Sequence, residues 1–454
     1  MAFKTFNRTL YYALETTEGT FNTPNATSGY LEVIEPTFTI TNRVFDRNPT
    51  RNSITRAVQH VGGTSTTDPS AMVELSFTVE MAGSGTAATA PRWGNLLKAC
   101  GLLQVDSLKR CVIADATSNA SPAQAPIVFF HKENISAGLT GAGYSSGDRV
   151  GRVIGDTFYD DDNIFFTKAS ASNTVTSSEY IAGENSEAEA QAAAETASGV
   201  AWIPTSGAEL GSGNNSSISF RLAFETSNAS SSNAYIDIAG ARGNVEFAFV
   251  SGDRVLMNFT FMGRLVEYGN NATLTPKAEG REIPPAFMGV NLALEDSAYG
   301  DSTAAAYTSS VFSQMTINLN NDLVVRDGAS FDGGYDVCYI TGRNPQLTID
   351  PDSIEDSDYN FWDRFFSGKT MHGQMTIGST SGNKFLVKFP AAQIANLGDG
   401  NRDEVMTYDI AATLTGGDYG SSIKRAYDSS ISTDSTAQMN PRNGTNNEFV
   451  LIHF

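Results

Sequence analysis

The chain has 454 residues, and its 50 acidic side chains against 30 Lys and Arg give a net charge of −20. This balance argues against a protein that grips nucleic acid through its phosphates, because such binding needs an excess of Lys and Arg. No segment approaches the roughly 20 apolar residues that cross a bilayer, no secretory leader is expected, and three cysteines are too few for a disulfide framework.

The beginning of the chain predicts an arm, then strands and a projecting hairpin. Residues 1–30 are polar and rich in turn-forming residues, so we expect an extended N-terminal arm. Strands are predicted at 31–34 and 37–40. Residues 42–70 hold few apolar side chains but many Arg, Asn, Thr and Gly, which is typical of a long hairpin that leaves its sheet.

A strand and a short helix follow. Residues 73–80 alternate apolar and polar side chains, which is the pattern of a half-buried antiparallel strand. Gly101 is expected to end the helix, and we predict that its apolar face packs on a sheet. That face consists of Trp93, Leu96, Leu97 and Cys100.

Residues 112–199 differ in composition from the rest of the chain and predict an inserted β-rich subdomain. Within it, 147–154 and 164–167 are typical of short strands. The Ala- and Glu-rich tract 184–197 predicts either a short helix or a flexible segment. Alternating strands are predicted to resume at 217–224, 235–238 and 244–249.

The second half of the chain repeats the order of the first half at low identity. A strand and a charged loop open each copy, at 38–47 and 315–327. A strand and a helix follow in both, and the second helix contains Trp362, Phe365 and Phe366. Each copy then has another strand, at 253–265 and 402–414, and 448–454 predicts a final strand. The expected domains are 31–111 with 200–268 for the first unit, 112–199 for the insert, 269–284 for a linker and 285–454 for the second unit.

Catalytic or metal chemistry has little support in the sequence. The four histidines are scattered and show no metal-binding pair. Acidic clusters at 160–162 and 350–358 have the side chains that a hard cation needs, but neither fits an EF-hand. The second also suits capping of the helix that follows. We therefore expect structural roles for both clusters, no cofactor and no enzyme activity.

Two charged loops, one in each copy, are the candidate contact sites. In an acidic chain, Arg concentrated on a long loop can pair with carboxylates of a neighbouring subunit. A solvated loop without a partner is the alternative interpretation. The residues proposed for contacts between subunits or rings are Arg43, Phe45, Asp46, Arg47, Arg51 and Arg56 in the first loop and Arg326, Asp327 and Phe331 in the second.

Several motifs carry a resemblance to a known family. In the first copy they are Glu15-Thr-Thr-Glu-Gly-Thr, the 74–80 strand with Met81-Ala-Gly-Ser-Gly-Thr-Ala, and Ala90-Pro-Arg-Trp-Gly-Asn-Leu-Leu-Lys-Ala-Cys-Gly101. Further along they are Ala239-Gly-Ala-Arg-Gly-Asn-Val-Glu-Phe247, Asn258-Phe-Thr-Phe-Met-Gly263 and Ala391-Ala-Gln-Ile-Ala-Asn-Leu-Gly398. In combination they resemble the major tail tube proteins of long-tailed, siphovirus-like bacteriophages. The resemblance covers most of 10–103, 200–268 and 310–416 and leaves out the insert.

This resemblance implies a mainly β fold of two tandem tail-tube-type antiparallel β-sandwich domains, each with a flanking short helix. It implies stacked rings around a channel through which double-stranded DNA is ejected. Tail tubes of this family are usually six-fold, so two such domains in one chain predict a homotrimeric ring with pseudo-six-fold symmetry. Acidic side chains would face the channel, the charged loops would join rings, and the insert would decorate the outside.

The resemblance also implies partners and a location. The partners are further copies of the chain, a tape-measure protein and the tail-tip and terminator proteins, with no membrane involved. The location is a virion assembled in the bacterial cytoplasm. Other classes stay open: a carbohydrate-binding β-sandwich surface protein, a β-sandwich hydrolase with paired carboxylates, or the tube of a tail-derived particle such as a gene-transfer agent.

Overall fold

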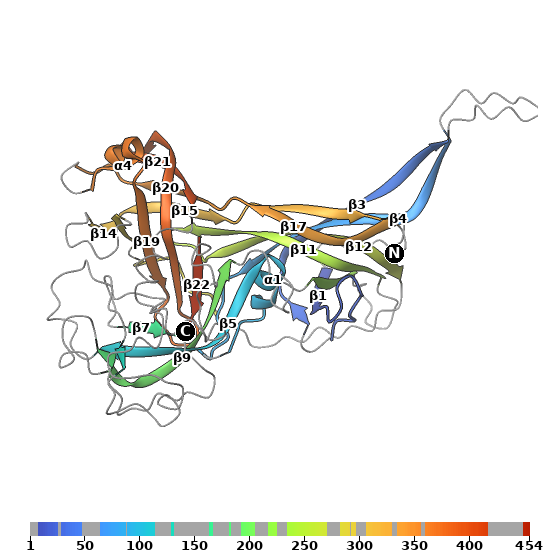
Figure 1. The fold of residues 1–454 in the computed structure, drawn as a ribbon, viewed down its shortest axis with the longest axis horizontal. Helices are drawn as coiled ribbons and strands as arrows, with labels where there is room; N and C mark the ends of the chain where they lie inside the picture. The colour runs from blue at the N-terminus through green and yellow to red at the C-terminus, as the bar shows by residue number, and fades with distance from the viewer. Residues whose placement is uncertain are drawn as a thin grey trace, which may run out of the picture.

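The computed structural model describes residues 8–25, 29–47, 64–87, 89–113, 129–130, 163–166, 181–182, 192–204, 217–224, 234–269, 282–290, 292–296, 306–328, 334–355, 359–415 and 448–454. Over these stretches the protein is mainly β with antiparallel strands and two short helices, which confirms the predicted fold class. The molecule is elongated, and the strands of the first and second halves gather mainly at opposite ends (Figure 1). That these halves are tail-tube-type domains stays a prediction.

Four strands of the first half lie side by side in the order β3 (Ile34–Arg47), β4 (Thr64–Glu80), β12 (Leu256–Gly269) and β11 (Ala234–Val250). The first part of β11 also pairs with β10 (Ile218–Phe224). The core lies between these two groups of strands, because Phe220 of β10 contacts Phe77 and Phe261 at ring-centroid distances of 6.0 and 4.8 Å.

The first described strand is part of this sheet, which corrects the predicted arm from Arg8 onward. β1 (Arg8–Leu14) pairs with β10 along its whole length and with β2 (Tyr30–Leu31). Leu10 and Tyr11 are fully buried. The prediction failed because the few core residues of β1 are surrounded by polar residues, whereas the turn-rich composition begins only after the strand.

The second half repeats this strand order as β15 (Phe312–Asn318), β18 (Gln346–Pro351), β21 (Val405–Leu414) and β20 (Phe385–Arg402). The first part of β20 pairs with β19 (Thr370–Ile377), as β11 pairs with β10. β13 (Leu292–Asp296) joins β19, and β14 (Ala306–Ser310) joins β13. The predicted final strand is β22 (Val450–His453), which pairs with β20.

One sheet runs through both halves of the chain. The second part of β11 pairs with β15, from Glu246 opposite Asn318 to Val250 opposite Gln314. The strands therefore follow in the unbroken order β3, β4, β12, β11, β15, β18, β21 and β20. The two halves are thus joined edge to edge by backbone hydrogen bonds.

The two predicted helices are present, but they are buried to different extents. α1 (Gly94–Ala99) buries Leu96 and Leu97, with Cys100 directly after it, as its apolar face predicts. α4 (Phe361–Ser367) begins at Asn360, whose side chain accepts a hydrogen bond from the Asp363 amide at 2.8 Å. On α4, Trp362 and Phe366 are 37% and 78% exposed.

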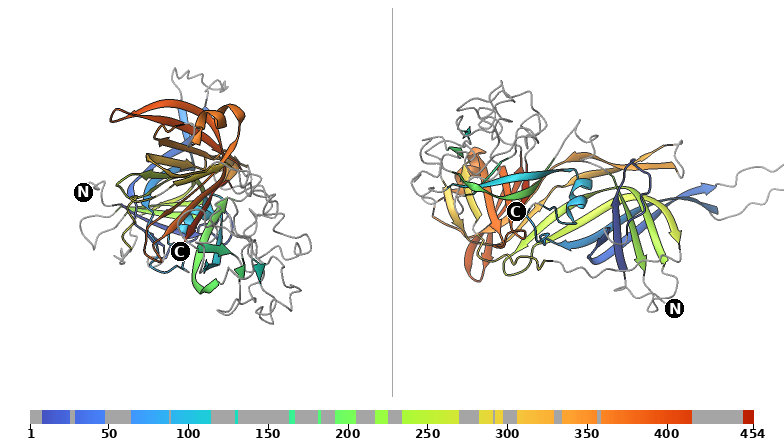
Figure 2. Two further views of the ribbon diagram at one scale, coloured as in Figure 1. Left: turned by 90° about the vertical axis from the view of Figure 1, so that its left-hand side faces the viewer. Right: turned by 90° about the horizontal axis from the view of Figure 1, so that it is seen from below.

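The predicted insert stands on a pair of long strands. β5 (Leu102–Ile113) pairs with β9 (Ala192–Pro204), and β9 pairs with β22. β7 (Asn163–Phe166) joins β5, and β6 (Phe129–Phe130) pairs with β8 (Ile181–Ala182). Figure 2 shows the β5–β9 pair leaving the body on the side of the second half. A helix over 184–197 is wrong from Ala192 onward, because pairing with β5 draws these residues into a strand; 147–154 lies outside the described residues.

Two hairpins complete the fold. The ends of β3 and β4 leave the body together, as predicted for 42–70, although 48–63 lie outside the described residues (Figure 1). In the second half, the corresponding segment forms a separate two-stranded sheet of β16 (Asn321–Asp327) and β17 (Tyr335–Arg343). This second hairpin contacts β11 and β12 of the first half.

Candidate functional site

The face of the continuous sheet that points away from the core carries short polar side chains. A row of directly paired residues crosses this face from Thr78 through Asn258, Glu246 and Asn318 to Gln346. These residues lie on β4, β12, β11, β15 and β18, so the row spans both halves of the chain. Alternation along each strand sends their neighbours, such as Phe77 and Phe247, into the core.

Hydrogen bonds connect this row side chain to side chain from Thr78 to Asn318, and Asn244 joins it. Thr78 Oγ1 donates to Asn258 Oδ1 at 2.8 Å, and Asn258 Nδ2 donates to Glu246 Oε1 at 3.2 Å. Asn318 Nδ2 donates to the other oxygen, Glu246 Oε2, at 3.1 Å, and Asn244 Nδ2 donates to Asn318 Oδ1 at 2.8 Å. We call the five hydrogen-bonded residues the polar ladder: Thr78, Asn258, Glu246, Asn318 and Asn244. Because Glu246 accepts from both halves, the ladder also fixes the register of the β11–β15 junction.

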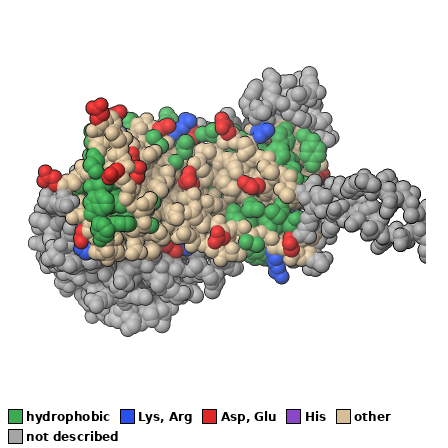
Figure 3. Space-filling model, turned by 90° about the horizontal axis from the view of Figure 1, so that it is seen from above, with side chains coloured by type: hydrophobic (Ala, Val, Ile, Leu, Met, Phe, Trp, Pro, Cys, Tyr) green, Lys and Arg blue, Asp and Glu red, His purple; other side chains and the backbone are tan. Residues whose placement is uncertain are grey.

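The charge of this face is acidic. Glu74 and Asp409 are exposed on it, and Glu246 is half-buried. Arg254 and Arg402, at the ends of the strands, are paired with carboxylates: Arg254 lies 2.7 Å from Glu80, and Arg402 contacts Asp350 and Asp352. Seen from above, the middle of the molecule is mainly polar, with scattered acidic side chains and few basic ones, and hydrophobic patches lie toward both ends (Figure 3). Such a face offers few cations to a phosphate backbone.

The acidic cluster at 350–358 has a structural role where it is described. The Asp350 carboxylate accepts hydrogen bonds from the amides of Ser313 and Gln314 at 2.8 and 2.7 Å, and also from the Ser313 hydroxyl. Among the described residues, no group of three or more His, Cys, Asp or Glu is arranged to hold a metal ion. The cluster at 160–162 lies outside them.

The charged hairpin of the second half lies on the first half of the same chain. Arg242 of β11 is buried, and its Nη1 donates to the Cys338 carbonyl of β17 at 2.5 Å. Its guanidinium lies 5.4 Å from the ring centroid of Tyr339 and 2.5 Å from Glu18. Burial raises the pKa of the Cys338 thiol to about 11, although Arg242 opposes this effect.

Asn321, the first residue of this hairpin, makes a second set of contacts. Its side-chain amide donates to the carbonyls of Cys100 and Gly243 at 2.8 and 3.0 Å, and its backbone amide donates to Asn244 Oδ1 at 3.0 Å. Gly240 on β11 has a φ of +63°, and a Cβ there would lie 3.0 Å from Val337 of the hairpin. The hairpin therefore sits on β11 and on the C-terminal end of α1.

The predicted contact residues fall in different places. Arg326 is 64% exposed and lies 3.9 Å from Asp336 across its own hairpin, and Asp327 is paired with Tyr335. Four residues of the first loop lie on the projecting end of β3, paired with β4: Arg43, Phe45, Asp46 and Arg47. Arg51, Arg56 and Phe331 lie outside the described residues.

Sequence reasoning missed Arg242 and Asn321, which fix the second hairpin. Arg242 had one available signal, since it is a lone cation in an otherwise small and apolar stretch of a predicted strand. Buried Arg in such a position is costly unless it is paired, so a partner could have been expected. Asn321 had no comparable signal, because polar residues are common in loops.

The C-terminal strand joins the halves at a third place, because β22 pairs with β9 from Leu451 opposite Trp202 to His453 opposite Val200. His453 is fully buried, its Nε2–H donates to the Gly382 carbonyl at 2.8 Å, and its ring lies 5.3 Å from Phe385. Burial lowers the pKa of His453. Before the start of the same strand, Arg343 Nη2 lies 3.1 Å from Glu448, whose pKa is raised by burial against the opposing effect of Arg343.

Comparisons with known proteins add no assignment: no family model matches the chain, and no curated protein matches it. None of the described helices has the length and apolar character needed to cross a membrane.

Proposed function

We propose that the protein is a structural virion protein that assembles with copies of itself into the hollow tail tube of a long-tailed bacteriophage. Rings of three chains with pseudo-six-fold symmetry stack into the tube, and double-stranded DNA passes through it during ejection. The tape-measure protein and the tail-tip and terminator proteins are the further partners. The protein acts as structure, without a catalytic site or cofactor.

The observation that carries this proposal is the continuous sheet with its repeated order of strands. Within one chain, β11, which is the end strand of the first unit in the sheet order, pairs with β15, which begins the sheet order of the second unit. Two edges of the sheet have no partner among the described strands. One is the edge of β3 that faces away from β4, and the other is the edge of the second part of β20 that faces away from β21. A repeated unit whose exposed edges match its own internal junction is suited to closed, rotationally symmetric association.

The polar ladder supports a channel wall. Its amide, hydroxyl and carboxylate groups bond to one another, so few donors are left to hold a passing phosphate. Exposed carboxylates on this face, such as those of Glu74 and Asp409, repel a polyanion. A wall of this kind lets DNA slide without a binding minimum.

The tube of a tail-derived particle, such as a gene-transfer agent, is an alternative with the same architecture. A carbohydrate-binding surface protein is the alternative from another class, and one observation favours it. Trp362 and Phe366 are exposed and stacked, with ring centroids 6.1 Å apart. A monomer that bound glycans, with binding lost in Trp362→Ala, would favour this class.

Electron microscopy of the purified protein, together with its mass in solution, tests the proposal. We expect hollow tubes or rings of three chains, with a pseudo-six-fold image in projection. Addition of a tail-tip complex controls for a requirement for an initiator. A chain that stays monomeric at high concentration and in the presence of that complex would contradict the tube.

A further inference from the structure

The duplicated halves differ in what covers them. In the first half, Ala99 at the end of α1 and Gly243 on β11 are buried, and the β16–β17 hairpin lies over this region. In the second half, Phe366 at the end of α4 is 78% exposed, and Ala395 and Asn396 on β20 are exposed. The second half thus has a bare surface where the first half has a covered one.

The strand pairings show which positions correspond. Val245 lies opposite Phe259, which lies opposite Phe77; Leu397 lies opposite Ile410, which lies opposite Ile349. When Phe77 of β4 is matched with Ile349 of β18, Val245 corresponds to Leu397. The motifs that begin at Ala239 and Ala391 then align without a gap. This alignment matches Asn244 of β11 with Asn396 of β20, and Ala395 lies in a β-bulge directly before Asn396.

The hairpins correspond in the same way. Phe38 lies opposite Leu75 and Ile317 lies opposite Leu347, so Ile40 of β3 has the position of Leu319 after β15. Leu319 is 1% exposed because it lies in the junction between the halves, whereas Ile40 is 38% exposed. The same counting places Asn42 at the position of Asn321.

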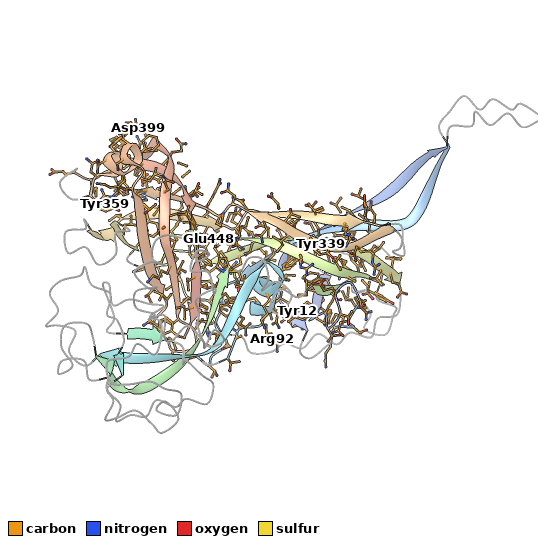
Figure 4. The ribbon with its side chains drawn as sticks, in the orientation of Figure 1. Tyr12, Arg92, Tyr339, Tyr359, Asp399 and Glu448 are labelled. Carbon is orange, nitrogen blue, oxygen red and sulfur yellow. The ribbon has the colours of Figure 1, made fainter. Side chains whose placement is uncertain are left out.

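We infer that the bare surface around Ala395, Asn396 and α4 binds the β3–β4 hairpin of a second copy of the chain. The arrangement repeats the one that β15, β16 and β17 make with the first half. The projecting ends of β3 and β4 lie at the opposite end of the molecule from Asp399, which is beside the bare surface (Figures 1 and 4). One chain therefore cannot bring its own hairpin to its own bare surface, and the occupant is another copy. The contact rests on the proposed function and adds its residues and register.

The internal junction also gives the register of the contact between chains. Glu246 opposite Asn318 becomes Gly398 opposite Thr39 of the second copy, and Ala248 opposite Thr316 becomes Gly400 opposite Thr37. Side chains directly opposite in an antiparallel pair have Cβ atoms about 5 Å apart, which a short thiol cross-linker spans.

Cross-linking tests this register in the full-length chain, in a background with Cys111→Ser. Thr39→Cys combined with Gly398→Cys is expected to give covalent dimers and trimers after treatment with a short bis-thiosulfonate. Thr41→Cys combined with Gly400→Cys is the control, because it is four residues out of register, about 13 Å. Ala248→Cys combined with Thr316→Cys, within one chain, verifies that the reagent acts on such a pair.

The outcomes separate the contact from the proposed function. Rings or tubes whose in-register pair fails to cross-link, while the pair within the chain does, would overturn the contact and leave the tube intact. Absence of any assembly in the unmodified chain would overturn both.

A matched pair of substitutions gives an independent measurement. Ile40→Asn is expected to weaken assembly at least tenfold while leaving the thermal unfolding midpoint of the isolated chain unchanged. Leu319→Asn, at the corresponding position, is expected to lower that midpoint strongly because its side chain is buried within the chain. Assembly of Ile40→Asn at the unmodified concentration would contradict the contact.

Discussion

At the scale of single residues, the buried carboxylate of Glu15 organises the start of the chain. Its Oε1 accepts hydrogen bonds from the Ser219 hydroxyl and the Gly240 amide, both at 2.7 Å. Its Oε2 accepts from the Gly19 amide at 2.7 Å and from the Ser217 hydroxyl. These donors belong to three separate segments, so one side chain ties the turn after β1 to β10 and β11.

Glu15→Ala is therefore expected to lower the free energy of unfolding by about 2–3 kcal/mol, because it leaves buried donors unsatisfied. Denaturant unfolding of the purified variant measures the change. Glu74→Ala is the matched control, since Glu74 is an exposed carboxylate on β4, and it should cost less than about 0.5 kcal/mol. Equal effects of the two substitutions would contradict the role of Glu15.

His453 predicts a pH dependence with a definite sign. Burial lowers its pKa in the folded state, whereas the unfolded chain has a value of about 6.5. Below that pH the unfolded state binds a proton on His453 more readily than the folded state does. The contribution of His453 to the free energy of unfolding is therefore fully present above about pH 6.5 and is lost as the pH falls. The slope approaches about 1.4 kcal/mol per pH unit.

Unfolding measured between pH 7 and pH 5 in the native chain and in His453→Gln checks this prediction. The variant should lose the His453 contribution to the slope. Glu448 acts in the opposite direction, because its raised folded-state pKa favours the folded state as pH falls, and it is present in both proteins. Identical slopes would show that His453 does not titrate as expected.

At the scale of elements, the β5–β9 pair separates the insert from the rest of the fold. Ile113 and Ala192 are directly opposite each other at its described end. The base of the pair is anchored, because β9 pairs with β22 and Trp202 contacts Trp93 with ring centroids 4.9 Å apart. We therefore expect the part beyond Ile113 to be dispensable for the core.

Replacing residues 114–191 by Asn-Gly, a favoured two-residue hairpin turn, is expected to give a folded protein. Its unfolding midpoint should lie within a few degrees of that of the full chain, and electron microscopy should show tubes with a thinner outer surface. Loss of folding would show that the insert contributes to the core. Loss of tubes from a folded variant would contradict a decorating role.

The elements differ in how far the sequence predicts them. β4 and β12 were predictable because each has one face in the core and one in the open, which imposes strict alternation. β9 was not, because the helix propensity of Ala is a weak preference that strand pairing overrides. The polar ladder and the Arg242 contact depend on residues far apart in the sequence, so alternation identifies their strands but not their partners.

At the scale of the whole molecule, the position of the acidic side chains matters as well as the net charge. The net charge of −20 indicates only that phosphate binding is disfavoured. The structure puts Glu74, Glu246 and Asp409 on the same face as the hydrogen-bonded hydroxyl and amide groups. Electrostatic repulsion of DNA therefore acts along the face that we propose for the channel wall.

Glu74→Lys is expected to make assembled particles retain DNA, because every chain then presents a cation to the passing phosphates. Binding of a fluorescent duplex is measured by anisotropy at about 50 mM and about 200 mM salt, and it should weaken at the higher concentration. Glu74→Gln controls for loss of the negative charge alone. Equal retention by the two variants would place Glu74 away from the DNA path.

The pairing of β11 with β15 has a kinetic consequence. Its two partners belong to one chain, so they do not have to meet by diffusion, and tethering gives them an effective concentration in about the millimolar range. In the proposed ring, every second junction is therefore formed before any two chains collide. Nucleation of a ring involves half as many separate chains as it would if each chain held a single unit. The protein concentration at which assembly begins is therefore lower.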